Sequence, residues 1–223
     1  MIPRVPTPSV SSGAQVFGEV ADALGVTPDS RVKILFCVEG PNDVIAYKWL
    51  SRALHLADGS LPDLSTDERV AFVPLGGGTL KHWVSHRYLS GLRKPEVHIY
   101  DRDVPDYANA VATVNARTDG SWATLTTKHE IESYLHTDAI AEAFGFQLEI
   151  IDHPGDNGKA VPALFGEAFV AHRGHGTPLK DSKSKQKLAE AFSRMNADRV
   201  NARDAQREVE GWFRRIGGMI DVA

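Results

Sequence analysis

The chain contains one cysteine, Cys37, among its 223 residues, so no disulfide can form within it. The scarcity of cysteine suits a protein of the reducing cytoplasm, which is the location we expect. It also excludes any site made from a cluster of thiolates. A functional site in this chain must therefore be built from carboxylates, histidines and lysines.

The sequence also lacks long uncharged apolar runs, and its mean hydropathy is −0.25. This excludes a membrane-spanning helix, so no membrane partner is expected. Residues 1–8 have no apolar core of the length found in signal peptides. Lysine and arginine number 25 against 29 aspartates and glutamates, giving a net charge of −4. That balance excludes a uniformly basic protein that coats nucleic acid, although a local basic patch is still compatible with it.

Charge is distributed unevenly along the chain. Residues 172–215 hold eleven lysines and arginines against six acidic residues, whereas the rest of the chain holds fourteen against twenty-three. An acidic body with a basic C-terminal region is typical of a metal site that lies beside a polyanion-binding surface. The alternative is two helices whose charged faces are simply solvated.

Apolar runs of strand length alternate with segments of helical periodicity in the first part of the chain. The predicted strands are residues 32–38, 70–75, 97–100 and 122–126, and the predicted helices are 44–56, 79–92 and 107–116. Repeated strand–turn–helix units predict an α/β fold with a mainly parallel, Rossmann-like sheet flanked by helices. Right-handed crossovers would place the carboxyl ends of all four strands at one edge of this sheet.

The pattern changes near residue 137, which suggests three regions. Residues 1–30 are predicted to be a leader or linker with a helix at 13–24, and residues 31–136 the α/β core. Residues 137–223 are predicted to be a small helical appendage with a basic tail. Its helices are expected at 138–144, 160–172, 184–195 and 200–216.

Acidic residues follow three of the four predicted strands: Glu39 and Asp43, Asp101 and Asp103, and Glu130 and Glu132. Parallel strands would bring these groups together, and so many carboxylates in a small space repel one another unless cations bind them. An all-oxygen set of ligands favours Mg²⁺ or Mn²⁺. Two such ions would activate water and stabilise the leaving oxygen of a phosphodiester.

Three ordered motifs resemble the core of the Toprim domain: residues 38–43 (VEGPND), 73–78 (VPLGGG) and 99–103 (IYDRD). The resemblance covers roughly residues 31–135. Topoisomerases, bacterial primases, recombination mediators and several nucleases share this fold. Residues 128–135 (KHEIESYL) and the basic tail are most similar to the OLD (overcoming lysogenization defect) family of nucleases.

OLD proteins join an ATPase to a C-terminal Toprim nuclease. The present sequence has no Gly-x-x-x-x-Gly-Lys-Ser/Thr phosphate loop, so the resemblance implies that an ATPase domain is missing from this chain. The proline-rich start favours an excised C-terminal region, and a stand-alone Toprim protein is the alternative.

The resemblance also implies roles for particular residues. Glu39 would be a metal ligand or an acid–base group, and Asp43 a second acidic group. Asp101 and Asp103 would hold the metals, and Glu132 matches a further acidic position, with Glu130 as its alternative. A lysine of the C-terminal region would stabilise charge on the phosphate. The candidates are Lys183, Lys185 and Lys187, of which we favour Lys185 because its spacing fits the first turn of the helix that follows.

The expected activity is metal-dependent hydrolysis of DNA, by endonuclease or exonuclease cleavage with two metal ions. One alternative is another Toprim enzyme, such as an RNA-maturing nuclease or a primase-like protein. A non-catalytic nucleic-acid-binding module is the other. Arg203, Arg207 and Arg214 are expected to contact DNA phosphates.

Three other features are ambiguous in the sequence. Residues 76–78 (GGG) are either a permissive turn or a phosphate cradle. His82 and His86 have the i,i+4 spacing of zinc ligands without an evident third ligand. Tyr134 and Tyr107 are of the residue type that topoisomerases use as nucleophile, but Tyr134 is better explained by packing.

Overall fold

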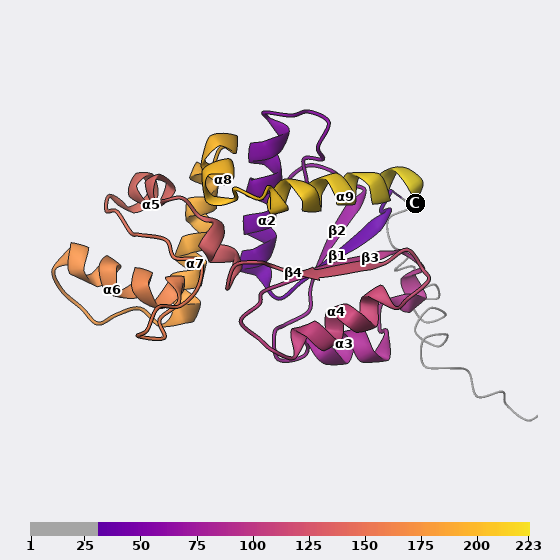
Figure 1. Ribbon diagram of the computed structural model, residues 1–223, viewed down its shortest axis with the longest axis horizontal. Helices are drawn as coiled ribbons and strands as arrows, with labels where there is room; N and C mark the ends of the chain where they lie inside the picture. Colours follow the sequence, from indigo (N-terminus) through magenta and orange to yellow (C-terminus); the bar gives the residue numbers. More distant parts are fainter. Residues whose placement is uncertain (1–30) are drawn as a thin grey trace, which may run out of the picture.

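The computed structural model describes residues 31–223, so the predicted helix at 13–24 lies outside the described part. The described chain contains a four-strand parallel sheet in the order β2-β1-β3-β4, with helices on both faces (Figure 1). The strands are β1 (Ile34–Val38), β2 (Val70–Pro74), β3 (Glu96–Tyr100) and β4 (Trp122–Leu125). The α/β fold predicted from the sequence is therefore confirmed.

Helices of the described chain cover both faces of the sheet (Figure 1). One face carries α2 (Pro41–His55) and α9 (Glu208–Val222), and the other carries α3 (Leu80–His86) and α4 (Tyr107–Asn115). Successive side chains of β1 point to opposite faces, so Phe36 packs with the first pair of helices and Cys37 with the second. Every residue of β1 is buried, which explains its continuous apolar run.

The helical appendage lies beyond the carboxyl ends of the strands (Figure 1). It comprises a 3₁₀ turn (Ile131–Tyr134), α5 (Thr137–Phe144), α6 (Val161–Arg173), α7 (Asp181–Ala191) and α8 (Ala197–Arg203). From there α9 returns to the sheet, where Trp212 and Phe213 are buried in the core that it shares with α2. Among the helices of residues 31–223, none is both long and apolar enough to cross a membrane.

Four predicted helices have bounds that differ by three residues or more. Helix α2 begins at Pro41 and not at residue 44, and the other three differ as follows. The helix expected at 200–216 is divided into α8 and α9, because the Asp204 carboxylate accepts a hydrogen bond from the Val209 amide at 2.7 Å. Arg207, with φ of 55°, completes this break. The helix expected at 79–92 ends at His86, where Arg87 adopts a left-handed conformation. Helix α7 begins at Asp181, so Lys185 lies in its second turn and not in its first.

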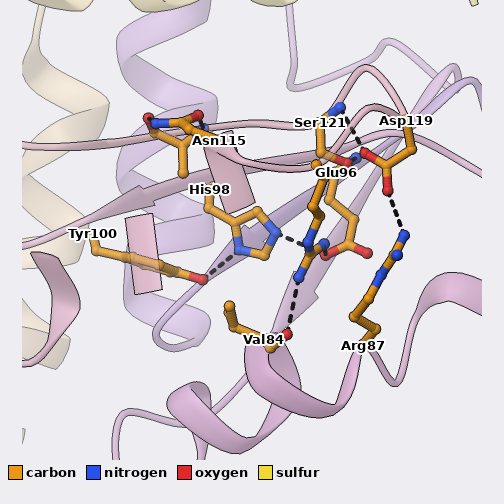
Figure 2. A network of polar contacts seen from close by, with 10 residues as sticks. Val84, Arg87, Glu96, His98, Tyr100, Asn115, Asp119 and Ser121 are labelled. Atoms are coloured by element: carbon orange, nitrogen blue, oxygen red, sulfur yellow. Dashed lines mark hydrogen bonds and ion pairs between the residues drawn. The ribbon is translucent and has the colours of Figure 1, made fainter. Parts of the chain in front are cut away.

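A buried polar network lies between the sheet and the helices α3 and α4 (Figure 2). Glu96 accepts from His98 Nε2 at 2.8 Å and pairs with Arg117 at 2.9 Å. Arg117 also donates to the Val84 carbonyl of α3 at 3.0 Å. The network therefore fixes α3 against β3, through the loop that follows α4.

Cys37, Glu96 and His98 offer three potential metal ligands within 4.8 Å of one another. Both ring nitrogens of His98 are nevertheless occupied, one by Glu96 and the other by the Tyr100 hydroxyl. Glu96 is neutralised by Arg117. Burial lowers the pKa of His98, which keeps the imidazole neutral. We interpret this group as a structural network.

Candidate metal and active site

Three carboxylates converge at the edge of the sheet where the strands end. Glu39 directly follows β1, and Asp101 and Asp103 follow β3, the strand paired with β1. One oxygen from each of the three lies within 4.8 Å of the others. Asp101 is buried, Glu39 is partly buried and Asp103 is exposed, so the group is open to solvent on one side. This arrangement is suited to holding a divalent cation that also contacts a ligand.

Asp43 belongs to the same acidic region, and it also accepts a hydrogen bond from the backbone. It lies in the first turn of α2, and its Oδ2 accepts a hydrogen bond from the Gly40 amide at 2.7 Å. This bond fixes the turn between β1 and α2 that carries Glu39. Burial raises the pKa of Asp43 in spite of the hydrogen bond.

The remaining two acidic residues lie beside a lysine. Glu130 and Glu132 are buried at the 3₁₀ turn after β4, and Lys185 reaches them from α7. Lys185 Nζ lies 3.3 Å from Glu130 Oε2 and 3.8 Å from Glu132 Oε2. The other oxygen of Glu130 accepts from the Val161 amide at the start of α6, at 3.1 Å. Helices α6 and α7 are thus tied to the acidic region by charged contacts.

Of the three candidate lysines, Lys185 is the one that the structure places among the carboxylates. Lys183 instead donates to Gln186 Oε1 at 3.2 Å, and the Lys187 ammonium lies 5.1 Å from the centre of the Phe169 ring. The preference for Lys185 stated from the sequence agrees with this placement, although the reason given for it, a first-turn position, was wrong.

Burial and mutual repulsion raise the pKa values of the site. Burial raises the pKa of Glu39 to about 7, and the negative charges of Asp43 and Asp103 add to this rise. Burial raises the pKa of Glu132 to about 8, although Lys185 opposes this rise. Burial and the nearby Glu132 raise the pKa of Asp101 well above its ordinary value. The carboxylates would therefore not all be ionised near neutral pH without an added cation.

Two buried oxygens of the site have no hydrogen-bond partner within residues 31–223. These are Oε1 of Glu39 and Oε2 of Glu132. Buried polar atoms are normally satisfied. Glu132 Oε2 has the Lys185 ammonium at 3.8 Å, whereas Glu39 Oε1 has no ion pair within the described chain and is the oxygen that an added cation would satisfy. The oxygen donors of this site are of the type that hard divalent cations prefer.

The turn after β2 lies against Glu39. A Cβ added to Gly77 would lie 3.2 Å from Glu39 Oε2, so a larger residue would crowd the carboxylate. The Tyr107 hydroxyl donates to the Gly77 carbonyl at 3.4 Å. It also lies close enough to Glu39 to oppose the rise in the pKa of that carboxyl. In the sequence, Tyr107 is notable only as a residue of the type that topoisomerases use as nucleophile. Tyr107 lies at the start of the helix that follows Asp103, and this position in the sequence could have indicated that its side chain supports the acidic site.

Tyr134 is buried and links the site to the last helix. Its hydroxyl donates to Glu208 Oε2 at 2.5 Å, and Glu208 also accepts from the Thr127 amide at 3.0 Å. This placement supports the packing interpretation made from the sequence, with Glu208 as the principal polar partner.

The arginines expected to contact DNA are engaged in ion pairs. Arg203 donates to Asp152 at 2.5 Å and to the Ser133 carbonyl at 2.8 Å. Arg207 and Arg214 both pair with Glu210. These arginines would have to leave their carboxylate partners to contact DNA phosphates. Their role in DNA binding stays a prediction.

Comparison with protein-family models, curated proteins and solved structures found no match for this chain. The function is therefore inferred from the sequence motifs and the geometry of the site.

Proposed function

We propose that this protein is a metal-dependent nuclease that hydrolyses phosphodiester bonds in DNA. The observation that carries the proposal is the convergence of Glu39, Asp101 and Asp103 within 4.8 Å, with Lys185 at the two neighbouring glutamates. The resemblance of the motifs to Toprim and OLD-type nucleases supports the same reaction.

Glu39, Asp101 and Asp103 would hold one Mg²⁺ or Mn²⁺ ion. Asp43 and Glu132 are the further acidic groups that would serve a second ion. When bound, these ions would supply an activated water and neutralise charge on the phosphate. The exposed side of Asp103 leaves room for the substrate at this site.

Lys185 contributes the protein's own positive charge. Burial alone would lower its pKa, but Glu132, Asp101 and Glu130 together raise it, so the ammonium form is maintained. An ammonium group fixed beside the acidic site would stabilise the extra negative charge that develops on phosphate during hydrolysis. The resemblance to OLD proteins also suggests an ATPase partner and a cytoplasmic location, and both are part of this proposal.

The test is cleavage of supercoiled plasmid DNA in Mg²⁺, Mn²⁺ or EDTA. We expect nicking or linearisation only with the metals, and reduction to background in Asp101→Asn. Asp106→Asn is the matched control because Asp106 is an exposed acid in the same loop but outside the cluster. Binding of DNA without cleavage in any metal would replace the proposal with a binding module. Cleavage of structured RNA alone would replace it with an RNA-maturing enzyme.

A further inference from the structure

Helix α3 and the second residue after its end carry a contiguous set of rings. The rings of His82 and His86 lie 6.0 Å apart between centroids, and Tyr88 stacks on His86 at 5.3 Å with an interplanar angle of 12°. Trp83 meets Tyr88 edge-on at 5.5 Å. The left-handed conformation of Arg87, with φ of 51°, turns the chain so that Tyr88 folds back onto the helix.

Three of these four rings face solvent, and Trp83 packs against the core. His82 and His86 are exposed, and 52% of the Tyr88 surface is accessible. Within residues 31–223 the Tyr88 hydroxyl has no hydrogen-bond partner, so no polar contact there accounts for the position of the ring. An exposed stack of planar rings is a surface that can be extended by another planar ring, such as an unpaired base.

The surrounding charge suits a polyanion. Residues 69–95 contain five lysines and arginines and no acidic residue, in a chain that has 29 acidic residues. Arg87 is paired with Asp119 at 2.7 Å and Lys81 lies 3.8 Å from Asp106. Arg93 and Lys94 have no carboxylate at ion-pair distance within the described chain. Arg93 and Lys94 line a pocket with Asp119, the partner of Arg87. They supply positive charge in the segment between α3 and β3 that also contains Tyr88.

Helix α3, which carries the histidine rings, starts close to the candidate active site. Helix α3 starts three residues after Gly77, which abuts Glu39. From Leu80 to His86 the helix rises about 9 Å, which corresponds to about three nucleotides at ~3.4 Å each. A strand that leaves the carboxylates along α3 would reach His86 and Tyr88 within that length.

The helix is also held rigidly. Arg117 donates to the Val84 carbonyl, and Arg87 pairs with Asp119, on the side of α3 that faces the sheet and α4 (Figure 2). A surface that is already fixed loses little conformational entropy when it binds a ligand.

We propose that the surface formed by His82, His86 and Tyr88 binds an unpaired nucleic-acid strand next to the cleavage site. Bases would stack on Tyr88 and His86, and Arg93 and Lys94 would contact backbone phosphates. This inference rests on the proposed nuclease function and makes it more specific. The substrate would be single-stranded, or a duplex with a single-stranded extension, because stacking requires an exposed base face.

The first measurement locates the strand. An oligonucleotide carrying 5-iodouracil is crosslinked to the protein in Ca²⁺, and the protein is digested with trypsin. We expect the crosslink in the peptide of residues 88–93, which contains Tyr88, or in the peptide of residues 82–87. Crosslinks confined to other peptides would overturn the proposal.

The second measurement compares affinities for single-stranded and blunt duplex DNA in Ca²⁺. Tyr88→Leu is expected to weaken single-strand binding about ten-fold, while Tyr88→Phe keeps the ring and binds like the wild type. Trp49→Leu, at an exposed ring on α2 on the opposite face of the sheet, is the matched control and should have no effect. An equal loss for duplex and single strand would overturn stacking on unpaired bases, and so would wild-type binding by Tyr88→Leu.

Plasmid cleavage is measured in the same variants so that the two proposals fail separately. If the wild type cleaves DNA only with metal but Tyr88→Leu binds single strands like the wild type, the proposal of the ring surface fails and the nuclease proposal stands. If the wild type binds single strands through Tyr88 but cleaves nothing in either metal, the ring surface stands as a binding site and the nuclease proposal fails.

Discussion

Lys185 supplies a positive charge to the part of the acidic region that contains Glu130 and Glu132. Its ammonium lies between Glu130 and Glu132, whereas Glu39, Asp101 and Asp103 converge without a protein cation as close. Within the described chain, the acidic region is thus divided into Glu130 and Glu132, which have a lysine at ion-pair distance, and Glu39, Asp101 and Asp103, which have none. This division gives the lysine a role that differs from that of a residue which only contacts DNA.

Replacing Lys185 by methionine should lower the single-turnover cleavage rate by about 100-fold and change DNA affinity in Ca²⁺ little, because the lost charge acts on the transition state. Lys183→Met is the control, since Lys183 is exposed on the same helix and donates to Gln186. The readouts are single-turnover kinetics and fluorescence anisotropy. Equal losses of affinity and rate would show that Lys185 binds DNA and does not act in the chemical step.

At the scale of elements, the break between α8 and α9 decides where the last helix lies. Asp204 is buried and accepts a hydrogen bond from the Val209 amide, which lies near the start of α9. A continuous helix over these residues could not place Trp212 and Phe213 in the core with α2. The sequence pattern missed this break because aspartate, alanine, glutamine and arginine, at positions 204–207, are all compatible with a helix.

We expect Asp204→Ala to lower the free energy of unfolding by about 1–2 kcal/mol, because it removes a side-chain cap from a buried amide. Asp198→Ala, at an exposed acid in the first turn of α8, should have a much smaller effect. Urea unfolding followed by circular dichroism measures both. Equal stability of Asp204→Ala and the wild type would mean that packing of α9 alone sets the break.

At the scale of the whole molecule, the acidic site connects the stability of the fold to pH and to metal. The pKa of Glu39 is raised to about 7 and that of Glu132 to about 8, from an ordinary value of 4.5. Between pH 4.5 and 8, the folded, metal-free protein therefore binds more protons than the unfolded chain. The stabilisation from these groups is complete below pH 4.5 and is lost as the pH rises through 7 to 8.

In EDTA, the midpoint of thermal unfolding should fall between pH 5.5 and 8.5 more steeply for the wild type than for Asp101→Asn, which removes one repelling charge. Millimolar Mn²⁺ should reverse the fall in the wild type only, because the ion binds the ionised carboxylates. Asp106→Asn should follow the wild type. Parallel curves for the wild type and Asp101→Asn would contradict the electrostatic description of the site.

The fold was predictable because its signals are local. The apolar run of β1 and the acidic residues directly after β1 and β3 depend only on neighbouring residues, and parallel pairing then brings Glu39 and Asp101 to one edge. The same residue-by-residue pattern indicated helices in the appendage. The end of α3 at Arg87 and the break between α8 and α9 at Asp204 depended on left-handed residues and a buried cap, which the pattern does not encode.

The sequence by itself determined the α/β core and the acidic residues that follow its strands, because hydrophobic periodicity and strand ends depend on adjacent positions. Only the tertiary structure decided which lysine reaches Glu130 and Glu132, and that Arg203 and Arg214 are occupied by carboxylates. It also brought the rings of His86 and Tyr88 together at the surface. These relations join residues through the packing of helices and the turn after α3, and no sequence spacing specifies that packing.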